Sequence, residues 1–183
     1  MALRVTALLL LLFCAACAPT LDRLPSGKGS GWTPNGAGGL RPQIVPTAAH
    51  LECVPYAREQ SGIPIRGDAW TWWRSADGLY RRSRQPSVGS VLVLSRGGYL
   101  NGGHLAVVTG ILNSREIVVR HANWLNRGQI HIDTPVIDVS GGNDWSAVRV
   151  WYTPGRTYGA RTYPANGFIH PERLAAGPAN GAV

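Results

Sequence analysis

The chain has 183 residues, enough for one domain with flanking segments. Its net charge of +8 is carried almost wholly by arginine, since Lys28 is the only lysine. The arginines are scattered and no nucleic-acid-binding motif accompanies them, which argues against a nucleic-acid partner. A basic surface of this kind favours anionic partners such as cell-wall polymers or anionic lipid.

The N-terminal residues have the character of a signal peptide. Val5–Ala16 is almost wholly apolar and follows Arg4, and it is too short to span a bilayer comfortably. Residues 14–17 (CAAC) resemble the lipobox of bacterial lipoproteins, whose cysteine is acylated. We therefore expect residues 1–16 to be a lipoprotein-type signal peptide, and Cys17 to carry a lipid that anchors the chain to a membrane.

The rest of the chain divides by composition into three parts. Residues 17–49 are rich in glycine and proline and predict a flexible tether. We expect the folded domain over residues 50–152. In residues 153–183, Gly, Pro, Ala and Arg dominate again, which predicts a C-terminal tail that either wraps the domain or is disordered near its end.

Within the domain, helices are expected first and strands afterwards. A helix over Leu51–Ser61 ends at Gly62, and a second, short helix begins after Asp68 as its N-cap. Val-rich patterns predict strands at Ser90–Leu94, His104–Leu112, Glu116–Trp124, Gln129–Asp133 and Ala147–Tyr152, with a tight turn at Asn113-Ser114. This order predicts an α+β domain.

Cys53 is a candidate nucleophile. If Cys14 leaves with the signal peptide and Cys17 is acylated, Cys53 has no disulfide partner. In the first turn of the predicted helix, backbone N–H groups and the helix dipole favour the thiolate and can stabilise an oxyanion. The alternative is a small buried core residue.

Two later segments supply candidate partners for the thiol. His104 follows two glycines that allow close backbone approach, and it opens a predicted strand. His121 and Asn123 lie two residues apart, so on a strand both side chains point the same way. One of them could orient His104 through a ring nitrogen, or the pair could merely pin a loop.

Five short segments, in this order, resemble the sequence blocks of the CHAP domain, the cysteine- and histidine-dependent amidohydrolase/peptidase. They are residues 52–58 (ECVPYAR), 67–70 (GDAW), 86–93 (PSVGSVLV), 103–108 (GHLAVV) and 121–124 (HANW). The resemblance implies a papain-like α+β fold, with N-terminal helices packed on an antiparallel β-sheet, that cleaves amide bonds in peptidoglycan. By motif, it makes Cys53 the nucleophile and His104 the general base.

The third catalytic member stays open between two residues. Many family members have Glu-x-Asn where this chain has His121-Ala122-Asn123. His121 resembles the polar third residue of NlpC-type cell-wall peptidases, and Asn123 resembles the asparagine of papain-like enzymes. Some members also carry an acidic calcium loop before the cysteine, but residues 41–50 contain no acid, so we expect no metal and no cofactor.

The resulting hypothesis is an exported hydrolase, facing the periplasm and anchored by lipid, that acts on peptidoglycan as an N-acetylmuramoyl-L-alanine amidase or a peptide endopeptidase. The residue after Cys17 is not acidic, which by resemblance favours the outer membrane. One alternative is a catalytically silent module that binds peptidoglycan or a protein partner. Another is an acyltransferase that uses the same thiol. Whether an activator protein opens the cleft is left open.

Overall fold

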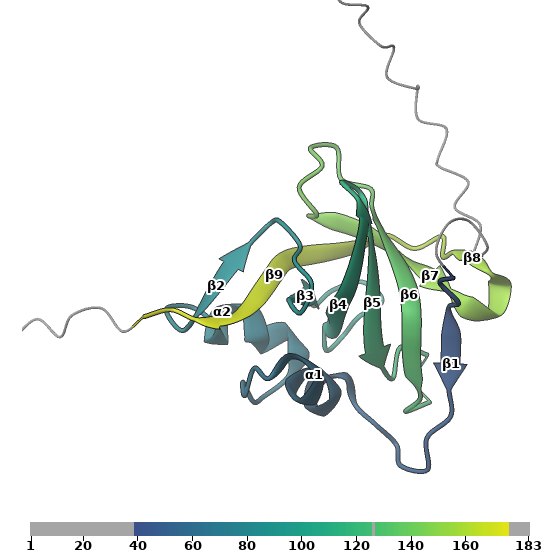
Figure 1. Ribbon diagram of the computed structural model, residues 1–183, viewed down its shortest axis with the longest axis horizontal. Coiled ribbons are helices and arrows are strands. Elements are labelled where there is room, and N and C mark those ends of the chain that lie inside the picture. The colour runs from purple at the N-terminus through teal and green to yellow at the C-terminus, as the bar shows by residue number, and fades with distance from the viewer. Residues whose placement is uncertain (1–38, 126, 176–183) are drawn as a thin grey trace, which may run out of the picture. The chain divides into compact units, whose positions relative to one another are not determined.

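Antiparallel strands dominate the structure, a computed structural model that describes residues 39–125 and 127–175 (Figure 1). Of the described residues, 43% lie in strands and 14% in helices, and the two α-helices are short. Six of the strands close into an antiparallel barrel. The predicted α+β fold, with N-terminal helices packed on an antiparallel sheet, is therefore wrong.

The described residues form four short helical elements and nine strands. The helical elements are α1 (Cys53–Ser61), η1 (Ala69–Thr71), α2 (Trp72–Ser75) and η2 (Thr153–Gly155). The strands are β1 (Gln43–Val45), β2 (Tyr80–Ser83), β3 (Val91–Leu94), β4 (His104–Asn113), β5 (Glu116–Ala122), β6 (Ile130–Asp138), β7 (Ala147–Tyr152), β8 (Thr157–Tyr158) and β9 (Tyr163–Arg173).

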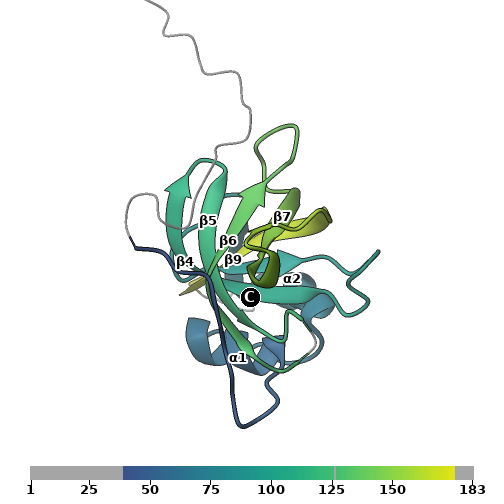
Figure 2. The ribbon, with the colours of Figure 1, turned by 90° about the vertical axis from the view of Figure 1, so that its right-hand side faces the viewer.

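The barrel closes because β6 pairs with β5 on one edge and with β7 on the other. The order around the ring is β6-β5-β4-β3-β9-β7. Three short strands extend it, with β1 on β6, β2 on β9 and β8 on β7. Figure 2 shows β5, β6 and β7 curving around one side. Closure pairs strand edges that an open sheet would leave exposed.

Strand β9 turns the sheet into a ring, because it joins β3 to β7. It lies in the segment that composition predicted to be a tail, and it contains Pro164, Gly167 and Pro171, which are unfavourable inside strands. Pairing with β2, β3 and β7 outweighs this local preference. The barrel thus continues past the domain boundary predicted at Tyr152.

Strand β3 is shared by two apolar cores, and all four of its residues are buried. Val91 and Val93 pack in a cluster with the helical segments, whereas Leu92 and Leu94 pack inside the barrel. A strand covered on both faces needs no polar side, which explains its continuous apolar sequence. Helix α1 packs against β4 and β5 and lies at their lower ends in Figures 1 and 2.

The two predicted helices are present, but both begin differently from the prediction. Helix α1 begins at Cys53, two residues after the predicted start at Leu51. Helix α1 ends at Gly62, which has a left-handed φ of 73° and donates its N–H to the carbonyl of Arg58. Asp68 precedes η1, but its side chain makes no capping hydrogen bond. Instead, its carboxylate accepts a 3.2 Å bond from the indole N–H of Trp70.

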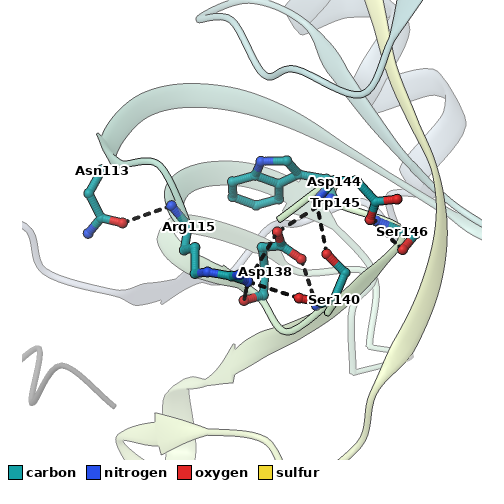
Figure 3. Close-up of polar contacts among 7 residues, drawn as sticks. All are labelled: Asn113, Arg115, Asp138, Ser140, Asp144, Trp145 and Ser146. Carbon is teal, nitrogen blue, oxygen red and sulfur yellow. Dashed lines mark hydrogen bonds and ion pairs between the residues drawn. The ribbon is translucent and has the colours of Figure 1, made fainter. Parts of the chain in front are cut away.

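A buried carboxylate organises the part of the barrel where β6 ends. Asp138 is 2% exposed and accepts backbone N–H bonds from Ser140 at 2.8 Å and from Trp145 at 3.4 Å (Figure 3). The guanidinium of Arg115 lies 3.5 Å from the same carboxylate. Asp138 thus ties the turn after β4 and the loop after β6 to the barrel wall.

Replacing Asp138 with alanine is expected to lower the free energy of unfolding by about 3 kcal/mol, because buried donors and a cation lose their acceptor. Denaturant unfolding followed by circular dichroism measures this change. Asp144→Ala is the matched control, since Asp144 is exposed in the same loop and bonds mainly to Ser146. Equal losses for the two variants would show that the buried carboxylate has no special role.

Several predictions concern residues outside the described ranges. They are the signal peptide at 1–16, the acylated Cys17 and most of the tether at 17–49. Within the described ranges, no helix has the length and apolar character needed to cross a membrane.

Candidate active site

An open cavity of about 500 Å³ lies where α1 and β4 begin. Cys53, the first residue of α1, and His104, the first residue of β4, both line it. The other walls are formed by Glu52, Val54, residues 67–69, residues 99–103, Asn123 and Trp124. Cys53 is a half-buried free thiol. The structure therefore brings the predicted nucleophile and the predicted base to one cavity from distant parts of the sequence.

The thiol of Cys53 is protonated at neutral pH. Burial raises its pKa, while backbone hydrogen bonds from Leu105, Cys53 and Val54 lower it and the negative charge of Glu52 raises it further. Backbone N–H groups at the start of the helix thus lower the thiol pKa, as predicted, but desolvation raises it by more. The expectation of a lowered thiol pKa is therefore wrong.

A glycine fixes the position at which β4, and with it His104, begins. Gly103 has a left-handed φ of 68°, and an added Cβ would lie 3.0 Å from both the carbonyl oxygen of Leu94 and the backbone nitrogen of Trp70. The carbonyl of Gly102 accepts a 3.0 Å bond from that same nitrogen. Only glycine permits this approach without displacement, as the sequence predicted.

His104 is hydrogen-bonded to a second buried histidine. Its Nε2 lies 2.9 Å from Nδ1 of His121, and the two residues are 5% and 1% exposed. Trp124 covers both, with ring centroids 4.9 Å and 5.3 Å from those of His104 and His121. Because the bond uses Nε2, the other nitrogen, Nδ1, is the one that His104 retains for the thiol.

Both histidines are neutral at neutral pH. Burial, together with repulsion from His131, lowers the pKa of His104 to about 3. Burial also lowers the pKa of His121 well below its ordinary value, with added repulsion from His104 and His131. If His104 donates from Nε2, its Nδ1 carries a free lone pair that can accept a proton. His121 then holds its proton on Nε2, which is buried without a hydrogen-bond partner among the described residues.

Asn123 lines the cavity but is engaged elsewhere. It adopts a left-handed φ of 61°, and its Oδ1 accepts the N–H of Gly128 at 2.8 Å. Its Nδ2 donates to Oε2 of Glu52, also at 2.8 Å. Asn123 therefore links the loop after β5 to the residue before Cys53. This geometry matches the loop-pinning alternative that the sequence left open.

His131 belongs to the site, although the sequence did not single it out. It pairs with His121 across β5 and β6, is 2% exposed, and has its ring centroid 5.2 Å from that of His121. Its side chain became a candidate only once the pairing of the two strands was known. Glu52 was likewise not predicted as a site residue, and it lines the cavity beside Cys53.

The donor groups at the site are arranged for proton transfer. Across residues 39–125 and 127–175, no group of three or more His, Cys, Asp or Glu side chains is placed to hold a metal ion. His121 instead contacts the rings of His104 and His131 edge to face, with centroid separations of 5.1 Å and 5.2 Å. A thiol beside neutral imidazoles can supply nucleophilic and general-base chemistry.

Comparison with protein-family models gives a match over the segment that contains Cys53 and His104. Residues 45–123 match the family model of the CHAP domain. These residues therefore resemble a CHAP domain, a domain of amidase- and peptidase-type hydrolases associated with peptidoglycan, and the resemblance found in the sequence motifs is confirmed. A comparison with curated proteins found no match. The catalytic roles of Cys53, His104, His121 and Asn123 stay predictions.

Proposed function

We propose that this protein is a cell-envelope cysteine hydrolase that cleaves amide bonds of peptidoglycan, either at the N-acetylmuramoyl-L-alanine bond or within the stem peptide. One observation carries this proposal. Cys53 and His104 line the same open cavity, and His121 occupies Nε2 of His104. This leaves Nδ1 of His104 as the base for the thiol.

The first half of the proposed reaction forms a thioester. The thiol of Cys53 gives its proton to Nδ1 of His104 as its sulfur bonds to the substrate carbonyl carbon, so the proton moves during attack and no preformed thiolate is required. The carbonyl oxygen becomes an oxyanion near the N-terminus of α1, where backbone N–H groups of Cys53 and Val54 lie close to the sulfur. Pro55, the next residue, has no N–H to contribute.

The second half releases the products. The imidazolium of His104 protonates the leaving amine as the carbon–nitrogen bond breaks. Water then attacks the thioester while His104 takes one of its protons, and the thiol leaves with that proton restored. Each proton removed is returned, so the cycle balances without a cofactor.

Product analysis tests the proposed function. The full-length protein, purified in mild detergent, is incubated with purified peptidoglycan beside its Cys53→Ala variant, and released fragments are identified by mass spectrometry. Fragments that require Cys53 support the hydrolase, and their masses distinguish an amidase from an endopeptidase. Equal release by both proteins would refute a thiol mechanism.

A matched pair of variants tests which residue orients His104. His121→Ala is expected to lower kcat by about 10²–10³-fold with little change in KM, because His104 loses the acceptor that fixes its tautomer. His121→Gln should recover part of this loss, since its amide oxygen can accept the same bond. Asn123→Ala should cost about tenfold or less. The opposite ranking would make Asn123 the orienting residue.

A catalytically silent module that binds peptidoglycan is the second candidate. It is favoured by the raised pKa of Cys53, and by a neutral histidine standing where many relatives carry an acid. An acid would stabilise the imidazolium, whereas neutral His121 does so more weakly. Binding to sacculi without fragment release would favour this candidate, or an enzyme that awaits an activator.

We also propose that the chain is exported and anchored at Cys17, with the outer membrane as its destination. The apolar run before residue 17 and the small residues beside it support this proposal. Metabolic labelling with palmitate followed by membrane fractionation tests it. Label that persists in a Cys17→Ser variant would contradict it.

A further inference from the structure

A second cavity of about 520 Å³ adjoins the active-site cavity. The two cavities share Tyr99, Leu100 and Trp124 as lining residues. Trp124 is the wall between them, because its ring lies 4.9 Å from that of His104 and 5.1 Å from that of Tyr163, which lines the second cavity. A chain-like substrate held at the thiol can therefore extend past Trp124 into the second cavity.

Arg161 gives the second cavity its charge. Its guanidinium carbon lies 4.0 Å from the ring centroid of Tyr99, so stacking orients the planar group. None of the described lining residues is acidic, whereas the active-site cavity contains Glu52 and Asp68. Arg161 also makes no ion pair within residues 39–125 and 127–175. The second cavity thus presents an oriented cation without a neutralising acid.

The second cavity is built largely outside the matched segment of the chain. Its wall comes from β7, from residues 159–161 after β8 and from Tyr163 at the start of β9, whereas the CHAP match ends at residue 123. Closure of the barrel by β9 brings this wall beside Trp124. A ligand preference determined by this cavity would therefore depend on residues C-terminal to the segment that matches the CHAP family.

We propose that the second cavity binds the stem peptide of peptidoglycan, and that Arg161 pairs with a free carboxylate on that stem. Substrates whose carboxylate is amidated are thereby disfavoured. This inference rests on the proposed function. Guanidinium binds carboxylate through two parallel hydrogen bonds, and the surrounding rings of Tyr99, Tyr152 and Tyr163 supply contact area for the rest of the peptide. Arg161 acts in specificity and takes no part in bond cleavage.

Binding measurements test this assignment separately from turnover. The full-length Cys53→Ala protein in detergent is titrated calorimetrically with three probes. They are a muropeptide with a free stem carboxylate, the same muropeptide with that carboxylate amidated, and the disaccharide without its peptide. Arg161→Gln and Arg161→Lys are added to this background. Arg96→Gln is the matched control, because Arg96 also stacks on an aromatic ring, that of Trp70, but lines neither cavity.

We expect Arg161→Gln to weaken binding of the free-carboxylate muropeptide about tenfold and to change binding of the amidated form less than about twofold. Arg161→Lys should keep part of the preference, and Arg96→Gln should keep all of it. An equal loss for both muropeptides, a loss shared with the disaccharide, or no binding of either muropeptide would overturn the proposal. Preferential binding through Arg161, without hydrolysis by the wild-type protein, would refute the proposed hydrolase activity. It would still support recognition of the stem peptide by the second cavity.

Discussion

Replacing His104 with glutamine is expected to lower kcat/KM for amide hydrolysis by about 10³–10⁴-fold. The reason is that the Cys53 thiol, whose pKa burial raises, stays protonated unless a base takes its proton during attack. Glutamine can still bond to His121 but cannot accept that proton. Steady-state kinetics on a fluorogenic muropeptide, with circular dichroism to confirm folding, measures the effect.

His170 provides the matched control for this variant. It is also a buried histidine, 1% exposed, but its two ring nitrogens bond to Ser83 and Ser87 at 2.8 Å and it lines neither cavity. His170→Gln should therefore change stability more than kcat/KM. If both variants lost activity to the same degree, the loss would reflect disturbed packing, and His104 would not be the base.

Acidification from pH 7 to pH 4 is expected to destabilise the fold strongly, because the site histidines are buried in neutral form. Burial lowers the pKa of His131 from 6.5 to about 4 and that of His104 to about 3. Between these values and 6.5 the unfolded chain binds protons that the folded chain does not, so stability is fully present above 6.5 and is lost as pH falls. For His131 alone this loss is roughly 3 kcal/mol.

Denaturant unfolding between pH 4 and pH 8 measures this dependence, and His131→Phe isolates one contribution. Phenylalanine keeps a ring against His121 but cannot titrate, so the variant should lose less stability than the wild type as pH falls below 6.5. Parallel pH profiles for the two proteins would contradict the assignment. Because His104 titrates near 3, the acid limit of activity is expected to follow unfolding and not the ordinary histidine pKa.

The parts of the structure that the sequence predicted are those encoded locally. Gly62 ends the helix that begins at Cys53, and apolar runs mark β3, β4 and β5. The motifs around Cys53 and His104 predicted two residues that line one cavity. In each instance a few neighbouring residues determine the feature, so composition and spacing were sufficient.

The features that were missed depend on contacts between distant segments. Strand β9 contains residues unfavourable in strands, and only its pairing with β3 and β7 makes it part of a barrel. The role of His131 follows from its register opposite His121. The direction of the Cys53 pKa shift follows from burial, which a helix-terminus argument does not include.

If the chain is exported as proposed, the protonated state of Cys53 also affects how the thiol resists an oxidising compartment. Peroxides attack the thiolate and react slowly with the thiol, so a raised pKa slows conversion to sulfenic acid. A nucleophile that is deprotonated only when substrate is in place spends most of its life in the form that resists oxidative damage. For the exported hydrolase proposed above, a neutral thiol–imidazole pair would thus slow oxidation of the nucleophile.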